Sequence, residues 1–120
     1  MSFDTETNGL DPEQNHIVGY SFCQDGKNAY YVATHHKVGC SNLGIEALDL
    51  IYEKMLRTKT VLMFNMRFDC RMMEYVGFED DPLPEDERWK KNHFRYDMTK
   101  VNVMDVQAIV YLADTNKKYP

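Results

Sequence analysis

The sequence lacks any apolar run that approaches the roughly 20 residues needed to cross a bilayer. It also lacks the basic and then apolar start of a secretory leader, because acids already stand at Asp4 and Glu6. These absences argue against a membrane protein and against a secreted protein. We therefore expect a cytoplasmic protein with no membrane partner.

Cysteine is scarce, and its three positions, Cys23, Cys40 and Cys70, contain no CxxC pair. An odd number of such cysteines is typical of reduced, structural thiols in a cytosol-like compartment. His35 and His36 stand near Cys40 in the sequence, but a zinc site needs four ligands at a recognisable spacing, and we find no fourth. We interpret the two histidines as loop residues.

A basic excess is absent as well, since the formal net charge at pH 7 is −5. This argues against a broad, non-specific nucleic-acid surface, which usually needs an excess of Lys and Arg. It does not exclude a nucleic-acid enzyme, because acids clustered around metal ions lower the count while the ions restore positive charge where phosphate binds. Net charge alone therefore decides little.

What the chain does contain is the composition of an ordinary soluble globular protein, with 43% apolar and 28% charged residues. Its 120 residues are enough for one domain, residues 1–120, with a core that needs no disulfides.

The patterns of apolar, β-branched and turn residues predict an element order of β-β-β-α-β-α-β-α. In chain order the predicted elements are strands at 3–7, 16–23 and 28–33, a helix from Ser41 or Asn42, a strand at 60–64, a helix ending at Gly77, a strand at 101–105 and a helix from Val106. We expect a side-chain oxygen of Ser41 or Asn42 to cap the first helix. We also expect strand 60–64 to be buried on both faces. This order predicts an α/β fold, a mixed sheet flanked by helices.

The stretch Phe3-Asp4-Thr5-Glu6-Thr7 places two carboxylates on one face of a strand, because strand side chains alternate. Two neighbouring acids repel each other unless one is protonated or a cation lies between them. A divalent metal with oxygen ligands is one interpretation. A solvated edge with two ordinary surface acids is the other, and this stretch alone leaves both open.

A second polar group follows the apolar strand at 60–64, with Asn65 at its exit and Asp69 in the first turn of the next helix. An acid in a first turn is often there only to complement the helix dipole. However, the functional groups of open sheets gather at the carboxyl ends of their strands, which favours a site here.

Together these residues carry a resemblance that covers nearly the whole chain. Asp4-Thr5-Glu6-Thr7, with Asn65-x-x-x-Asp69, resembles the first and second motifs of the DEDD (DnaQ-like) 3′–5′ exonucleases. Tyr111-Leu112-Ala113-Asp114-Thr115-Asn116 is most similar to the proofreading domain of bacterial and phage family A DNA polymerases. The resemblance implies a ribonuclease H-like sheet of three antiparallel strands followed by parallel ones. It also implies a location in the bacterial cytoplasm or in a phage-infected host.

The resemblance implies a role for each matching residue. Asp4, Glu6 and Asp69 match the catalytic ligands of a two-metal site that takes Mg²⁺ or Mn²⁺. The implied substrate-binding residues are Thr5, Thr7, Leu10, Asn65 and Phe68. Among them Asn65 matches the residue that helps to hold the terminal nucleotide, and Leu10 matches an apolar wedge against the last base. Without the resemblance, Leu10 would be interpreted as a simple loop anchor.

The pattern departs from the family at the third motif, a Tyr or His a few residues before an Asp on a later helix. Neither Tyr96-Asp97 nor Tyr111-x-x-Asp114 occupies that place. We therefore expect a domain that is incomplete at its C-terminus, with weak hydrolysis or none by this chain alone. Self-association at the gap is a further possibility.

Three functions stay open. The leading hypothesis is a proofreading exonuclease domain that acts on a single-stranded DNA 3′ end, with a polymerase domain in the same parent chain. The alternatives are a stand-alone DEDD exonuclease that acts on RNA, and a non-catalytic relic that binds a nucleic-acid end or a polymerase. The basic, aromatic segment from Trp89 to Tyr96 fits either contact with single strands or packing on the body of the domain.

Overall fold

The computed structural model describes residues 1–12, 14–37, 41–76 and 96–113. Five strands form one mixed sheet in the order β3-β2-β1-β4-β5. Their bounds are β1 Ser2–Thr7, β2 Ile17–Cys23, β3 Ala29–Ala33, β4 Val61–Met63 and β5 Val103–Asp105. The pairs β1–β2 and β2–β3 are antiparallel, whereas β1–β4 and β4–β5 are parallel. The predicted mixed sheet is confirmed.

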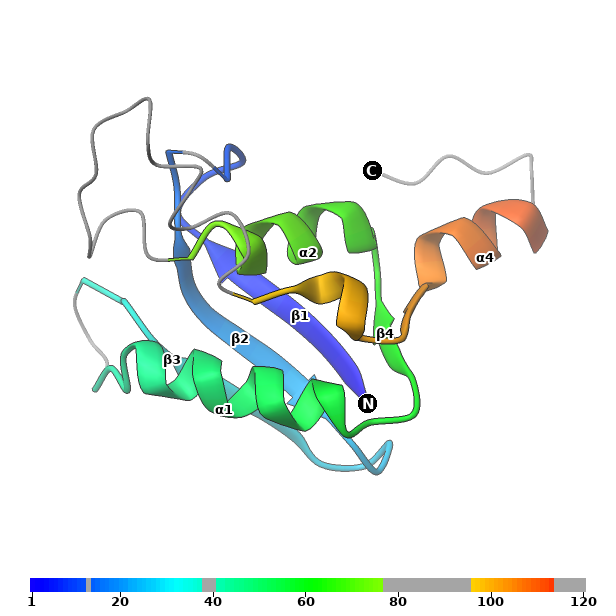
Figure 1. Ribbon diagram of the computed structural model, residues 1–120, viewed down its shortest axis with the longest axis horizontal. Helices are drawn as coiled ribbons and strands as arrows, with labels where there is room; N and C mark the ends of the chain where they lie inside the picture. The colour runs from blue at the N-terminus through cyan, green and yellow to red at the C-terminus, as the bar shows by residue number, and fades with distance from the viewer. Residues whose placement is uncertain (13, 38–40, 77–95, 114–120) are drawn as a thin grey trace.

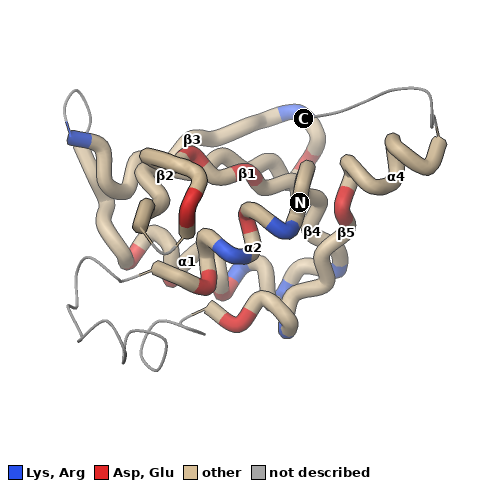
Figure 2. The backbone as a smooth tube through the Cα atoms, turned by 90° about the horizontal axis from the view of Figure 1, so that it is seen from above, with Lys and Arg blue, Asp and Glu red and all other residues tan. Residues whose placement is uncertain are grey.

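The described helices are α1, α2, a short 3₁₀ turn η2 and α4, with the bounds α1 Ile45–Leu56, α2 Met66–Glu74, η2 Met98–Lys100 and α4 Val106–Ala113. Both α1 and α2 lie on the same side of the sheet (Figures 1 and 2). We call the sheet face beneath them the covered face and the opposite one the open face. None of the helices in the described ranges is long and apolar enough to span a membrane.

The core forms between the covered face and the two helices, because alternate residues of each strand point into it. The strands β1, β2 and β4 and the helices α1 and α2 each contribute side chains that are almost completely inaccessible to solvent. The most buried large ones are Ile17, Leu48, Met55, Val61, Met63, Met72 and Met73. Tyr20 adds a polar link, since its hydroxyl donates to the Ala47 carbonyl at 2.8 Å and so fastens β2 to α1.

The hairpin between β2 and β3 turns at Asp25-Gly26, a dipeptide that favours tight hairpin turns. Gly26 has a φ of 73°, a conformation that costs glycine little. The Asp25 carboxylate accepts hydrogen bonds from the backbone N–H groups of Lys27 and Asn28, both at 2.8 Å. The hydrogen bonds from Asn28 and Lys27 lower the pKa of Asp25 to about 2, so the turn keeps its charged acceptor well below neutral pH.

The predicted start of α1 is wrong. The helix begins at Ile45, after Gly44 with a φ of 71°, and has no side-chain cap. Asn42 is engaged elsewhere: its Oδ1 accepts from the His36 backbone N–H at 2.8 Å, and its Nδ2 donates to the His36 carbonyl at 2.7 Å. A side chain that closes the preceding loop cannot also cap the helix, so the helix starts later.

The prediction that the 60–64 strand is buried on both faces is also wrong. Val61 and Met63 are buried on the covered face, but Leu62 is 38% exposed and Phe64 44% exposed. On β5, Met104 lies opposite Leu62 in the register and is 46% exposed. The two helices α1 and α2 cover only one face, so these apolar side chains remain on the open face.

The last described helix, α4, stands apart from α1 at the far end of the molecule (Figure 1). It carries no charged residue and buries none of its side chains within the described part of the chain (Figure 2). Its existence was predicted correctly. The predicted stop of the second helix at Gly77 falls outside the described residues.

Candidate functional site

The two acids of β1 lie together on the open face. Along this strand Phe3 and Thr5 are buried, whereas Asp4 and Glu6 are exposed. In the antiparallel register Asp4 lies opposite Ser21 and Glu6 opposite Gly19, so the β2 residues paired with the two acids are small, and the Tyr31 hydroxyl of β3 lies over Gly19. The sequence-based prediction that both acids share a face is confirmed.

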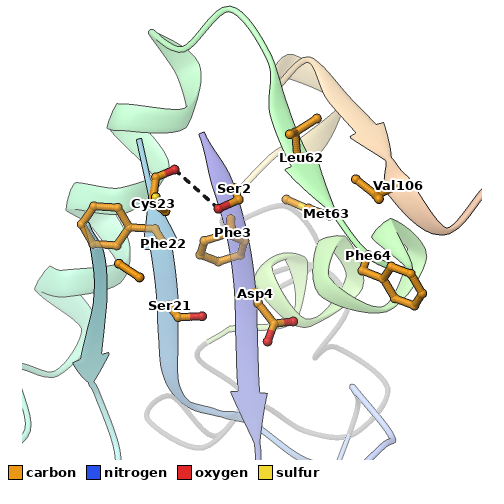
Figure 3. A pocket seen from close by; sticks show the side chains of 11 residues that line it. Ser2, Phe3, Asp4, Ser21, Phe22, Cys23, Leu62, Met63, Phe64 and Val106 are labelled. Atoms are coloured by element: carbon orange, nitrogen blue, oxygen red, sulfur yellow. Dashed lines mark hydrogen bonds between the residues drawn. The ribbon is translucent and has the colours of Figure 1, made fainter. Parts of the chain in front are cut away.

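Asp4 lies at the rim of a hollow of about 530 Å³ that crosses the open face. The hollow is lined by Ser2, Phe3, Asp4, Ser21, Phe22, Cys23, Ala29, Leu62, Met63, Phe64 and Val106. In Figure 3 the Asp4 carboxylate points from β1 towards the side on which Phe64 lies. The hollow therefore joins a carboxylate and small hydroxyl groups on β1 and β2 to an apolar wall on β4.

Asp69 reaches β1 from the helix side. It lies in the first turn of α2 and is only 2% exposed. Its Oδ1 accepts from the Thr5 hydroxyl at 2.5 Å and from the Thr5 backbone N–H at 3.3 Å. In the described chain, β1 and β4 are paired where Ser2 meets Leu62 and separate beyond it. Asp69 fills that gap with an acceptor for the Thr5 N–H, which would otherwise be buried without one.

The electrostatic state of Asp69 connects it to the two exposed acids. Burial raises the pKa of Asp69 to about 6, the hydrogen bond from the Thr5 side chain lowers it, and the charges of Asp4 and Glu6 raise it. The carboxyl group of Asp69 therefore lies within electrostatic reach of both acids, although its hydrogen bonds are made on the covered side of β1.

The described residues do not bring the three acids to a single point. Across ranges 1–12, 14–37, 41–76 and 96–113, no three His, Cys, Asp or Glu side chains form a group that could hold a metal ion. The donor chemistry of Asp4 and Glu6 nevertheless fits a hard cation. Mg²⁺ in particular is bound by one or two carboxylates and completes its shell with water and substrate phosphate oxygens. The pair on β1 is therefore the part of the predicted site that suits a metal, with Asp69 held apart by Thr5.

The residues that the resemblance assigns to substrate have mixed surroundings. Leu10 is 85% exposed in the turn after β1, as a wedge would need to be. Asn65 is exposed and Phe68 half-buried at the start of α2. Thr7 donates its hydroxyl to the Gly9 carbonyl at 2.7 Å, which shapes the turn that carries Leu10. Thr5 differs from the rest, because it is only 7% exposed and is bound to Asp69.

The backbone of Asn65 is held by a residue that the sequence analysis did not select. Asn65 has φ 64° and ψ 64°, and its N–H donates to Oδ1 of Asp105 at 3.0 Å. An acid between a strand and a helix is the available sequence signal, but it indicates only a helix cap. The link to Asn65, which is 40 positions away, depends on the pairing of β4 with β5.

The basic, aromatic segment Trp89–Tyr96 lies outside the described residues except for Tyr96. That residue is 2% exposed and donates its hydroxyl to Asp49 of α1 at 2.5 Å. Its ring also packs on Tyr52, with centroids 5.1 Å apart. Tyr96 thus follows the packing interpretation rather than the single-strand interpretation.

Comparison with known proteins gives one family. A family model described as the RNase H superfamily matches residues 1–118. A search of curated proteins gives no match.

Proposed function

The chain belongs to the RNase H superfamily, whose members are generally nucleases, and we propose that it is the 3′–5′ exonuclease domain of a DNA polymerase. In this role it would remove mispaired nucleotides from a DNA 3′ end. The observation that carries the proposal is the exposed Asp4–Glu6 pair beside the buried Asp69, at the sheet edge from which Asn65 also emerges. The carboxyl ends of β1, β4 and β5 share this edge, where open sheets place their ligands.

Asp4 and Glu6 would hold Mg²⁺ or Mn²⁺ together with oxygens of the substrate phosphate. The bound ion would supply Lewis-acid stabilisation of the phosphate charge and would lower the pKa of the attacking water. The chain's own contribution is to keep both carboxylates on one side of a rigid strand. The resemblance assigns Asp69 to the second-metal side. Bound to Thr5 on the covered side of β1, it would act by supporting the strand that carries Asp4 and Glu6 rather than as a direct ligand.

The remaining residues would bind the terminal nucleotide. Leu10 offers an exposed apolar surface against the last base, and Phe68 offers an aromatic ring from the start of α2. The exposed side chain of Asn65 would hydrogen-bond the nucleotide, and Thr7 would act on the same region through the Leu10 turn. A polymerase domain in the same parent chain would deliver the DNA end, in a bacterial cytoplasm or a phage-infected host.

A second candidate is a non-catalytic module that binds a nucleic-acid end. It is favoured by the absence of a three-ligand metal group among the described residues. A stand-alone exonuclease acting on RNA is the third candidate. Contacts to the 2′-hydroxyl of the substrate would distinguish it from the first.

A binding experiment with linear and circular single-stranded DNA tests the proposal. In the presence of Mn²⁺ we expect the chain to bind a linear oligonucleotide with a 3′ hydroxyl at least tenfold more tightly than a circular one of the same length. Glu6→Gln should remove this preference, whereas Glu53→Gln on the exposed side of α1 should keep it. Equal affinity for the two forms would contradict end recognition. A preference for RNA of the same sequence would favour the RNA exonuclease.

A further inference from the structure

Asp105 lies where β5, α4 and the turn between β4 and α2 meet. It is not among the residues that the sequence predicts for the site. It is the last residue of β5 and directly precedes α4. Its Oδ1 accepts from the Asn65 backbone N–H at 3.0 Å and from the Gln107 backbone N–H at 3.1 Å. One carboxylate oxygen therefore joins the β4–α2 turn to the start of α4.

The β4–α2 turn needs such support. Only Phe64 and Asn65 separate β4 from α2, and Asn65 adopts the left-handed conformation that an L-residue rarely takes. The side chain of Asn65 makes no capping hydrogen bond of its own to α2. Asparagine tolerates this conformation better than most residues do, but a strained backbone persists only where its surroundings hold it.

The neighbouring strand β5 stabilises the conformation of Asn65. In the parallel pair β4–β5, Asp105 lies opposite Met63, two residues before Asn65. The carboxylate extends past the end of the strand pair and meets the N–H group of Asn65. The same turn determines where α2 begins, and therefore where Phe68 and Asp69 lie, since the Phe68 N–H in turn bonds the Asn65 carbonyl at 3.1 Å.

We infer that Asp105 is a positioning residue, which holds the Asn65 turn and thereby places Asn65, Phe68 and Asp69 against β1. This inference rests on the proposed function for the use of those three residues. The competing role is a helix cap alone, because the bond to Gln107 is the usual one from an N-cap acid to the second helical N–H group.

Two substitutions separate the roles. Asp105→Asn keeps an acceptor oxygen at the same distance from the backbone and should preserve both bonds. Asp105→Ser keeps a good N-cap for Gln107, but its side chain is one bond shorter and should not reach Asn65. Asn102→Ala is the matched control, because it removes a bond to the Lys59 carbonyl at the opposite end of the same strand pair.

The first readout is amide hydrogen exchange measured by NMR in the metal-free chain. In Asp105→Ser, exchange of the Asn65 N–H should accelerate by on the order of tenfold relative to its neighbours, while the Gln107 N–H keeps its protection. Asp105→Asn and Asn102→Ala should leave the relative protection of Asn65 within about twofold of the original chain. Unchanged exchange at Asn65 in Asp105→Ser would overturn the inference.

The second readout is the affinity for linear DNA with a 3′ hydroxyl in Mn²⁺, compared at equal folded fraction. We expect Asp105→Ser to weaken this affinity about fivefold or more, with rescue by Asp105→Asn. Accelerated exchange with unchanged affinity would overturn the positioning role. If the original chain itself does not bind DNA ends, the proposed function fails, and the exchange result still decides whether Asp105 holds the turn.

Discussion

At the scale of single residues, the side chains of the Asp4-Thr5-Glu6 motif point alternately to the two faces of the sheet. Asp4 and Glu6 face outward, where a cation and a phosphate have access, and Thr5 faces inward to Asp69. Thr5 is therefore best interpreted as the residue that orients Asp69, rather than as a direct contact to substrate. The inward residue matters because a buried carboxylate needs donors.

Substitution of Thr5 by valine tests this division. The change removes the hydroxyl donor while preserving the shape of the side chain, so the buried Asp69 carboxylate loses its shortest hydrogen bond. We expect a loss of about 1–3 kcal/mol in the free energy of unfolding, measured in urea at pH 7 with a chelator. Thr7→Val removes a half-buried hydroxyl bond and should cost under about 1 kcal/mol. Equal losses would contradict the role of Thr5.

The raised pKa of Asp69 predicts a pH dependence of stability. The folded-state pKa is about 6, above the ordinary value of 3.8, so the folded chain keeps a proton that the unfolded chain releases in this window. Stability from this group is complete below about pH 4 and is lost as pH rises through 6, by up to about 3 kcal/mol. The free energy of unfolding, measured between pH 4 and 7 with a chelator present, should fall with rising pH in the original chain. In Asp69→Asn, which cannot titrate at this position, it should fall less. Parallel curves would show that Asp69 does not titrate in this range.

Cys70, next to Asp69 in α2, offers a residue-scale test of how deeply the start of this helix is buried. Burial, followed by the charges of Glu74, Asp69 and Asp105, raises the pKa of the Cys70 thiol to about 12. Because the thiolate is the reactive form, Cys70 should be alkylated at pH 8 at least a hundredfold more slowly than in urea. The Cys23→Ser/Cys40→Ser chain isolates Cys70 for this measurement, and equal rates with and without urea would be the contrary result.

At the scale of elements, β4 shows that the sheet is covered on one side by the described helices. The strand is short and apolar, which predicts burial but does not say on how many faces. Leu62 and Met63 are adjacent, yet Met63 is 1% exposed and Leu62 is 38% exposed. The strand therefore contains a matched pair for measuring the asymmetry.

Alanine substitution at these two positions should give different stabilities. Met63→Ala empties part of the core and should cost about 2–5 kcal/mol in the free energy of unfolding. Leu62→Ala removes a side chain that already meets solvent and should cost less than half as much. Chemical denaturation of both variants measures the difference. Similar losses would mean that the open face is covered in solution.

At the scale of the whole molecule, sequence patterns predict the fold well because strand alternation, helical spacing and turn residues are local. They predicted the element order and the shared face of Asp4 and Glu6. They were wrong about the cap of α1, because Asn42 bonds instead to His36 across a loop. They were also wrong about the burial of β4, because burial depends on what packs above the strand.

The contacts that shape the candidate site depend on tertiary structure. The bond from Thr5 to Asp69 spans 64 positions, and the bond from Asn65 to Asp105 spans 40. Neither follows from local spacing, since each requires the parallel pairing of strands that are distant in sequence. Self-association through the exposed apolar side chains stays a prediction.

A calorimetric titration with Mn²⁺ tests the central claim most directly, namely that the Asp4–Glu6 pair holds a metal for a DNA end. The chain, Asp4→Ala and the control Glu53→Gln are titrated with and without a short single-stranded DNA ending in a 3′ hydroxyl. The account predicts Mn²⁺ binding that strengthens with DNA, disappears in Asp4→Ala and persists in Glu53→Gln. Binding that is absent, or that is unchanged in Asp4→Ala, would contradict it.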